Sequence, residues 1–303
     1  MMEFTVFQQK ISDMLAGIDL RFNEPLAKHT SFQIGGPVEV MAFPKNSEEL
    51  AKILKQSAFL DRKPIILGAG TNVLAPDSGL EGIVICLKDC MDGLARLDGD
   101  RIRVAAGVTM ARAAVFAAGQ NLGGMEFAHG IPGTVGGGVY MNAGAYGGEI
   151  RDICESVEVM YLDGTMEILS AEQMCFSYRH SRLEDEAAIV VSAVFKLNPK
   201  PEIEVREQMQ ELLRKRKASQ PLEYPSAGSA FKRPVGGFAA ALIDQAGLKG
   251  FQIGGAAVSE KHAGFVVNLG GATAQDVLTL LREVAQIVYD KSGIQLEPEV
   301  RIW

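Results

Sequence analysis

The chain has few cysteines, no excess of basic residues and no long hydrophobic segment. Its four cysteines among 303 residues, Cys86, Cys90, Cys154 and Cys175, are too few and too irregularly spaced for a disulfide framework or a zinc site. We therefore expect reduced, buried thiols and no bound metal.

The charge balance and the hydrophobicity pattern exclude further classes of protein. A formal net charge of −7 argues against binding to nucleic acid or to a membrane surface, because both attract a basic face. No uninterrupted apolar run reaches the roughly 18 residues that a membrane span needs. The N-terminal residues also lack the basic and apolar regions of a secretory signal. The sequence thus predicts a cytoplasmic protein without membrane insertion, nucleic acid or an obligatory protein partner.

Glycine, in contrast, is abundant, and it is concentrated in one stretch. Residues 130–148 read "GIPGTVGGGVYMNAGAYGG", with eight glycines in nineteen residues. Helices avoid such a stretch, because each glycine costs about 1 kcal/mol relative to alanine. Bare main chain at a bend lets a large flat group lie directly against the backbone, although turns and bulges would also explain the glycines.

A second glycine loop, "ILGAGTNVL", follows an expected strand at residues 64–67. It lacks the third glycine and the following helix of a dinucleotide-binding fingerprint. Its backbone N–H groups can still converge on an anion such as a pyrophosphate, and a plain tight turn is the competing interpretation. Two such loops together favour an extended cofactor with phosphates and a planar ring.

Periodicity and turn residues predict an α+β protein in two parts. We expect hairpins that turn at Asp98-Gly99 and Asp163-Gly164, and a helix capped by Ser47. Further helices are expected over 109–120, 203–218 and 273–293. In the final strand, 294–303, Gln295, Glu297, Glu299 and Arg301 should share one face, opposite Leu296, Val300 and Ile302. The prolines of "NPKPE" suggest a boundary between parts at 1–200 and 201–303.

Six motifs carry a resemblance to a known family. They are "HTSFQIGGPVEVMAFP", "LGAGTNVL", "GIPGTVGGGVYMNAGAYGGEI", "FSYRHSR", "PSAGSAFKRP" and "LEPEVR". Their order resembles that of the UDP-N-acetylenolpyruvoylglucosamine reductases, flavoenzymes of peptidoglycan precursor synthesis. The resemblance implies an FAD-binding domain of the vanillyl-alcohol-oxidase (PCMH) type in 1–200 and a smaller α+β substrate-binding domain in 201–303. The short interval between Ser229 and Glu299 is similar to the compact form of the family.

The resemblance also implies the reaction and its catalytic residues. Noncovalent FAD, reduced by NADPH, would convert an enolpyruvyl ether into a lactyl ether. Arg179 matches the family's catalytic arginine, and a fixed guanidinium suits a carboxylate beside a carbon that gains charge. Ser229 matches the proton donor, and Glu299 matches the glutamate that helps to stabilise the enol-like intermediate. Without the resemblance, a salt bridge, a turn serine and a surface strand would be the simpler interpretations.

The same resemblance implies which residues hold the cofactor. We expect the two glycine loops against the FAD pyrophosphate, with Arg216 pointing toward phosphates and Arg301 reaching a carboxylate or a phosphate. The full set is Gly68, Ala69, Gly70, Thr71, Asn72, Val73, Leu74, Pro132, Gly133, Thr134, Gly136, Gly137, Asn142, Ala143, Gly144, Arg216 and Arg301. Tyr146 and Tyr178 are further expected nucleotide contacts.

Several assignments stay open at this stage. Arg214, Arg216 and Lys217 at a helix end would equally complement the helix dipole, and Lys232 and Arg233 could stabilise a Ser229 alkoxide. An oxidase on the same scaffold is the alternative function, because such enzymes often attach flavin covalently and His129 precedes the second loop. Flavin colour that stays with acid-precipitated protein would favour the oxidase. A colourless preparation would instead favour a non-catalytic sugar-nucleotide binder.

Overall fold

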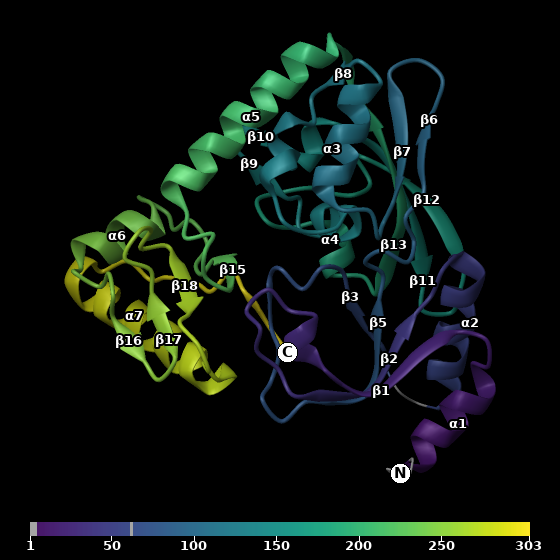
Figure 1. The fold of residues 1–303 in the computed structure, drawn as a ribbon, viewed down its shortest axis with the longest axis horizontal. Helices are drawn as coiled ribbons and strands as arrows, with labels where there is room; N and C mark the ends of the chain where they lie inside the picture. Colours follow the sequence, from purple (N-terminus) through teal and green to yellow (C-terminus); the bar gives the residue numbers. More distant parts are fainter. Residues whose placement is uncertain (1–4, 61–62) are drawn as a thin grey trace. The chain divides into compact units, whose positions relative to one another are not determined.

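The computed structural model describes residues 5–60 and 63–303, and they form two compact units. Unit 1 comprises the described residues up to Phe22, together with Glu39–Ala69 and Gly82–Arg214. Unit 2 comprises Asn23–Val38, Gly70–Glu81 and Lys215–Trp303. Each unit has its own cluster of buried hydrophobic residues. Figure 1 shows the elements of both units.

This division differs from a single boundary after residue 200. Two short N-terminal segments belong to unit 2, and the C-terminal part of that unit begins inside helix α5 (Glu202–Ser219). Pro201 does not interrupt regular structure, because its carbonyl accepts the N–H of Val205 in the first turn of α5. Proline is tolerated at a helix start, so "NPKPE" marks the beginning of a helix rather than a boundary between units.

The first sheet is built mainly from unit 1, and its strands follow the order β1-β2-β5-β3. The predicted cap at Ser47 is wrong by one residue. The N-cap of helix α2 (Ser47–Phe59) is Asn46, whose side chain accepts the N–H of Glu49. The elements are α1 (Val6–Met14), β1 (Asp19–Pro25), β2 (Pro37–Phe43), α2 (Ser47–Phe59), β3 (Ile65–Leu67) and β5 (Leu80–Cys86).

A five-stranded antiparallel sheet forms the other half of unit 1, in the order β12-β11-β13-β7-β6. It contains both hairpins predicted at the Asp-Gly turns. Helix α4 packs on β13 and β7, and α3 packs beside α4 (Figure 1). The elements are β6 (Leu94–Arg96), β7 (Arg101–Ala105), α3 (Met110–Gly119), α4 (Val135–Tyr140), β11 (Cys154–Tyr161), β12 (Met166–Ser170) and β13 (Ala188–Lys196).

Short elements connect these layers. They are the 3-10 turns η1 (Leu26–Lys28), η2 (Glu126–Gly130), η3 (Ile150–Asp152) and η4 (Arg182–Glu184), and the strand pairs β8 (Leu122–Gly123) with β14 (Asn198–Pro199) and β9 (Gly144–Ala145) with β10 (Gly148–Glu149).

Helix α4 corrects the expectation that the glycine-rich stretch avoids helix. Its six residues, "VGGGVY", include three glycines. Thr134 caps it, because the side chain accepts the Gly137 N–H. Four of its six residues, Val135, Gly136, Gly138 and Val139, are buried. Tertiary packing of that buried side therefore overrides the low helix propensity of glycine.

Unit 2 contains a four-stranded sheet in the order β15-β18-β17-β16, against which α7 packs. The capping box of α7 at Thr273 and the left-handed Gly293 at its end match the predicted helix. The elements are β15 (Ser226–Ser229), α6 (Ala239–Gln245), β16 (Gln252–Ile253), β17 (Ala256–Val258), β18 (Phe265–Asn268) and α7 (Ala274–Ser292).

The predicted final strand is shorter than expected. Only β19 (Arg301–Ile302) pairs as a strand, in parallel with β4 (Val73–Leu74), and Phe231 and Pro298 form an isolated bridge. Leu296 and Val300 are buried as predicted, whereas Ile302 is 50% exposed. The predicted alternation of faces therefore fails at Ile302, because Pro298 interrupts the strand and the last residues pair as a separate short segment.

None of the helices in the described part of the chain has the length and hydrophobicity that a membrane crossing requires. The described residues also contain no group of three or more His, Cys, Asp or Glu side chains that could hold a metal ion.

Candidate functional site

Arg179 occupies a strained turn in unit 1. Reciprocal hydrogen bonds between Ser177 and His180, of 3.1 and 3.2 Å, close the turn around it. Arg179 has a φ of 56°, in the left-handed region that normally favours glycine. An L-residue there costs roughly 1–2 kcal/mol, and such costs are concentrated at functional sites. The conformation supports a role for the side chain that glycine would not supply.

The guanidinium of Arg179 lies beside the second glycine loop. Its Nη2 is 3.4 Å from the carbonyl oxygen of Gly144, and its Cζ is 5.1 Å from the ring centre of Tyr178. Tyr178 is 50% exposed and Tyr146 is 46% exposed. The structure thus brings the predicted catalytic arginine together with the predicted loop at 142–144, inside one unit.

The side chain of Asn142, a predicted cofactor contact, is hydrogen-bonded within the protein. It is fully buried, with a φ of 42°, and its amide bonds to Glu149, to the carbonyl of Ser177 and to the N–H of Arg151. Because the protein itself uses this side chain, a contact between Asn142 and a cofactor would have to come from the main chain. Asn142 instead connects the glycine loop to the turn that carries Arg179.

Most glycines near these loops make room for the protein's own chain. An added Cβ on Gly68 would lie 2.5 Å from Thr134 Oγ1, so the two glycine loops touch where they begin. A Cβ on Gly136 would lie 2.9 Å from Ala106 Cβ, and one on Gly138 would lie 2.8 Å from Met110 Sδ. These glycines are required for packing.

Gly137 is different from its neighbours in α4. It is exposed, and the nearest atom to an added Cβ is Thr134 Oγ1 at 3.6 Å. Bare backbone here is not explained by internal packing, and it fits a position against which a flat or anionic group can lie.

Replacing Gly137 and Gly136 separately by alanine tests this distinction. Gly137→Ala should keep or raise the free energy of unfolding by up to about 1 kcal/mol, because alanine favours helix. If the cofactor lies against it, FAD binding should weaken by about 1–3 kcal/mol through overpacking. Gly136→Ala should lower the free energy of unfolding by about 1–3 kcal/mol, because the added Cβ would overpack against Ala106. Thermal unfolding of the apoprotein and a flavin titration separate the effects, and unchanged FAD affinity in Gly137→Ala would remove that residue from the cofactor site.

The remainder of the first glycine loop belongs to unit 2. Gly70 has a φ of 62°, and an added Cβ would lie 2.0 Å from the carbonyl oxygen of His29. The carbonyl of Gly70 accepts the N–H of Ser31 at 3.0 Å, and the hydroxyl of Ser31 donates to the carbonyl of Ser226 at 2.6 Å. Ser31 was not predicted, although it lies within the motif "HTSFQIGGP". It joins the loop to the strand that carries Ser229.

Asn72 joins the same loop to the C-terminal segment. Its Nδ2 is 3.3 Å from the carbonyl oxygen of Glu299, 227 positions away, and its own carbonyl accepts the N–H of Arg301 at 3.0 Å. Val73 pairs with Arg301 in the parallel register of β4 and β19. The predicted cofactor residues 70–74 and Arg301 are therefore neighbours in unit 2.

Ser229 and Glu299 are also carried by adjacent segments of unit 2. The Glu299 N–H donates to the carbonyl of Ala230 at 2.9 Å, and Ser229 pairs with Phe265 at the end of β15. Ser229 is exposed and Glu299 is partly buried. The structure thus brings two of the three predicted catalytic residues together from positions 70 residues apart. Arg179 belongs to unit 1.

Most of the cationic residues whose roles the sequence left undecided contact other residues of the protein. Arg214 bonds to Glu211 at 2.8 and 2.9 Å, and that hydrogen bond raises its pKa. Lys232 lies 3.7 Å from Glu297, and Arg233 stacks on the ring of Phe238 at 4.1 Å. Arg214 is therefore engaged as an ordinary helix-surface ion pair, while the carbonyl of Lys217 accepts from Lys261. Arg216 is half-buried in α5.

The histidine and cysteine side chains to which the alternative oxidase could attach flavin differ in burial and in pKa. Burial, and to a smaller extent the charge of Arg206, lowers the pKa of His129, so its imidazole is neutral near pH 7. Its Nδ1 is buried, and no hydrogen-bond partner for it occurs among the described residues. Burial raises the pKa of Cys154 to about 12 and that of Cys90 to about 11, which keeps both as thiols. Cys86 is buried in the same way, and its pKa is raised, whereas Cys175 is exposed.

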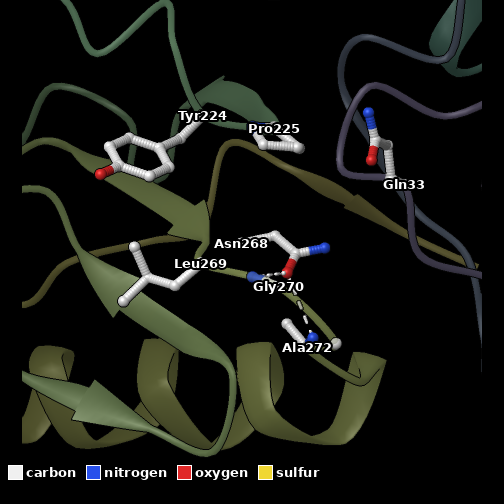
Figure 2. Close-up of a pocket in the computed structure, with 8 residues that line it drawn as sticks. Gln33, Tyr224, Pro225, Asn268, Leu269, Gly270 and Ala272 are labelled. Carbon is white, nitrogen blue, oxygen red and sulfur yellow. Dashed lines mark hydrogen bonds between the residues drawn. The ribbon is translucent and has the colours of Figure 1, made fainter.

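One pocket in unit 2 contains none of the predicted residues. It has a volume of about 270 Å³ and is lined by Gln33, Tyr224, Pro225 and residues 268–272. Figure 2 shows Tyr224 and Leu269 on one side and Gln33 on the other. The amide of Asn268 accepts the N–H groups of Gly270 and Ala272 and donates to the Phe32 carbonyl, so it holds the loop. None of the side chains that line this pocket is charged.

Comparison with known proteins decides the family. Residues 38–170 match an FAD binding domain, and residues 220–303 match the UDP-N-acetylenolpyruvoylglucosamine reductase C-terminal domain. Over 295 residues the chain is 45% identical to the UDP-N-acetylenolpyruvoylglucosamine reductase of Streptococcus pneumoniae strain Hungary19A-6, which covers 97% of each chain. The same values hold for strain 70585. This chain belongs to the UDP-N-acetylenolpyruvoylglucosamine reductase family.

A solved structure of the same family supports the architecture. The UDP-N-acetylenolpyruvylglucosamine reductase from Thermus caldophilus is 36% identical, with a TM-score of 0.80, over 94% of this chain and 98% of that one. The predicted family and fold class are confirmed: an FAD-binding domain is followed by the reductase C-terminal domain. The chain is an FAD-dependent oxidoreductase of this family. The roles of individual site residues remain predictions.

Proposed function

We propose that this reductase converts UDP-N-acetylglucosamine enolpyruvate into UDP-N-acetylmuramate in peptidoglycan precursor synthesis, with NADPH as the electron source and FAD bound noncovalently. The observation that carries the proposal is 45% identity to a reductase of that name over 97% of both chains. The left-handed Arg179 and the neighbouring segments of Ser229 and Glu299 support it. The cytoplasmic location stays a prediction.

The residues present fit FAD on structural grounds. Exposed Gly137 offers bare backbone without an internal packing reason, and Gly68 meets Thr134 at the start of both loops. We propose that Gly68, Ala69, Pro132–Gly137 and the main chain of 142–144 hold FAD in unit 1. For residues 70–74, Arg216 and Arg301, a cofactor contact stays a prediction from the sequence. When bound, FAD supplies hydride transfer from NADPH to the terminal vinyl carbon of the substrate.

Arg179 would stabilise the charge that this transfer creates. Addition of hydride to the vinyl carbon places negative charge on the carbon next to the substrate carboxylate, and the charge spreads into that carboxylate. A guanidinium keeps its charge at any working pH and grips a carboxylate through two bonds. The strained turn fixes its position in advance, so little reorganisation is needed during the reaction.

Ser229 and Glu299 would complete the reaction at the same carbon. In the proposed step the Ser229 hydroxyl gives its proton to that carbon, and hydride plus proton turn the enolpyruvyl ether into the lactyl ether. Glu299 would help to stabilise the enol-like intermediate. Lys232 pairs with Glu297, and Arg233 stacks on Phe238, so stabilisation of the serine alkoxide by these cations requires a change of partner when substrate binds.

An anaerobic experiment tests the assignment. Photoreduced, FAD-loaded protein should be reoxidised on addition of UDP-N-acetylglucosamine enolpyruvate, with formation of UDP-N-acetylmuramate. UDP-N-acetylglucosamine, which lacks the vinyl group, is the matched control and should leave the flavin reduced. Flavin that stays reduced with the enolpyruvyl substrate would reject the proposed function. Flavin that cannot be released by acid would instead favour the oxidase with a covalent link at His129.

A further inference from the structure

The turn that carries Arg179 is attached on both flanks to the chain at the end of α4. On one flank, Nδ2 of Asn142 donates to the carbonyl of Ser177 at 2.9 Å. On the other, the hydroxyl of Ser181 donates to the carbonyl of Tyr140 at 2.7 Å. Asn142 and Ser181 are both 0% exposed. Because these bonds are shielded from water, they hold the turn more firmly than surface contacts would.

The amide of Asn142 is directed entirely at the protein. Besides Ser177, its Nδ2 donates to Glu149 Oε2 at 3.0 Å, and its Oδ1 accepts the N–H of Arg151 at 3.0 Å. Glu149 lies on β10 and pairs with Gly144 of β9. One side chain thus fixes the glycine loop, the 149–151 segment and the Arg179 turn against each other.

We propose that Asn142 is a positioning residue for the substrate half-reaction, and that it acts by fixing the turn that presents Arg179. This inference rests on the proposed role of Arg179. It assigns Asn142 to the arginine rather than to direct side-chain contact with FAD. Ser181 is assigned the same function on the opposite flank. Small displacements of a catalytic group slow a reaction strongly, whereas the flavin contacts of other residues would be untouched.

A double-mutant cycle tests the proposal in FAD-loaded protein. Asn142→Gly keeps the left-handed backbone and removes the amide, and it should slow reoxidation by UDP-N-acetylglucosamine enolpyruvate by about 10-fold to 10²-fold. Reduction by NADPH should not change, and the affinity for FAD should fall by far less than the reoxidation rate, because the main chain of residue 142 is retained. In an Arg179→Gly background, Asn142→Gly should cause no further loss, because coupled residues are non-additive.

Asn121→Gly is the matched control. Asn121 is also left-handed, with a φ of 55°, and its side-chain oxygen accepts the N–H of Glu202 at 3.1 Å. This variant should keep both half-reactions. If Asn142→Gly does not fold, Ser181→Ala should show the same selective loss in the same cycle.

The following outcomes would overturn the proposal. Equal losses in the two half-reactions, or a loss of FAD affinity as large as the loss of the reoxidation rate, would assign Asn142 to the cofactor or to the fold. The same loss in both arginine backgrounds would show that the residue does not act through Arg179. A normal rate for Arg179→Gly would reject the proposed role of the arginine itself, whereas a slow Arg179→Gly with a normal Asn142→Gly would reject the positioning role alone.

Discussion

Replacing Arg179 by glycine should slow reoxidation of the reduced enzyme by substrate by about 10²–10³-fold, the range expected when one stabilising donor is lost from a developing charge. The free energy of unfolding should change by less than about 1 kcal/mol, because relief of the left-handed backbone offsets the larger entropy of glycine in the unfolded chain. Rapid-mixing kinetics of each half-reaction and denaturant unfolding measure the two quantities.

Cys175→Gly is the control for Arg179→Gly. Cys175 is exposed and also left-handed, with a φ of 49°, and it lies four residues before the arginine. This variant should relieve similar strain and leave both half-reactions intact. Arg179→Lys should recover only part of the rate, because lysine keeps the charge but loses the bidentate fork. A large loss of stability with normal kinetics in Arg179→Gly would make the arginine a structural residue.

Replacing Ser229 by alanine should slow the same half-reaction by about 10²–10⁴-fold, the contribution typical of a positioned proton donor. Flavin reduction by NADPH should remain intact, because the hydroxyl is proposed to act on the substrate carbon alone. Ser229→Cys should retain more activity, since it keeps a small protic group. Stopped-flow measurement of reduction and reoxidation in separate experiments gives both rates.

Ser226→Ala provides a control on the same strand. The described contact of Ser226 with Ser31 uses its main-chain carbonyl, so loss of the side-chain hydroxyl should leave that contact and both rates unchanged. Equal slowing of both half-reactions by Ser229→Ala would remove Ser229 from the proton-donor role.

Local signals in the sequence were sufficient for most elements. The Asp-Gly turns and the apolar periodicity each act over a few residues, so they can be read without knowledge of the fold. The ordered motifs carried the family assignment in the same way. Predictions failed where packing between distant residues decides the outcome, as in the three-glycine helix α4 and the exposed Ile302.

The sequence by itself determined the family, because residue type and order are sufficient to match it. The glycine loops, Arg179, Ser229 and Glu299 follow from that match as predicted site residues. Only the tertiary structure decided how the glycines divide between internal packing and open backbone, since that depends on neighbours such as Ala106 and Met110. It also revealed that Asn72 binds a segment 227 positions away, and that the amide of Asn142 is used within the protein. Hydrogen bonds of this kind join chain segments that no local pattern relates, and they exist only once both segments are folded.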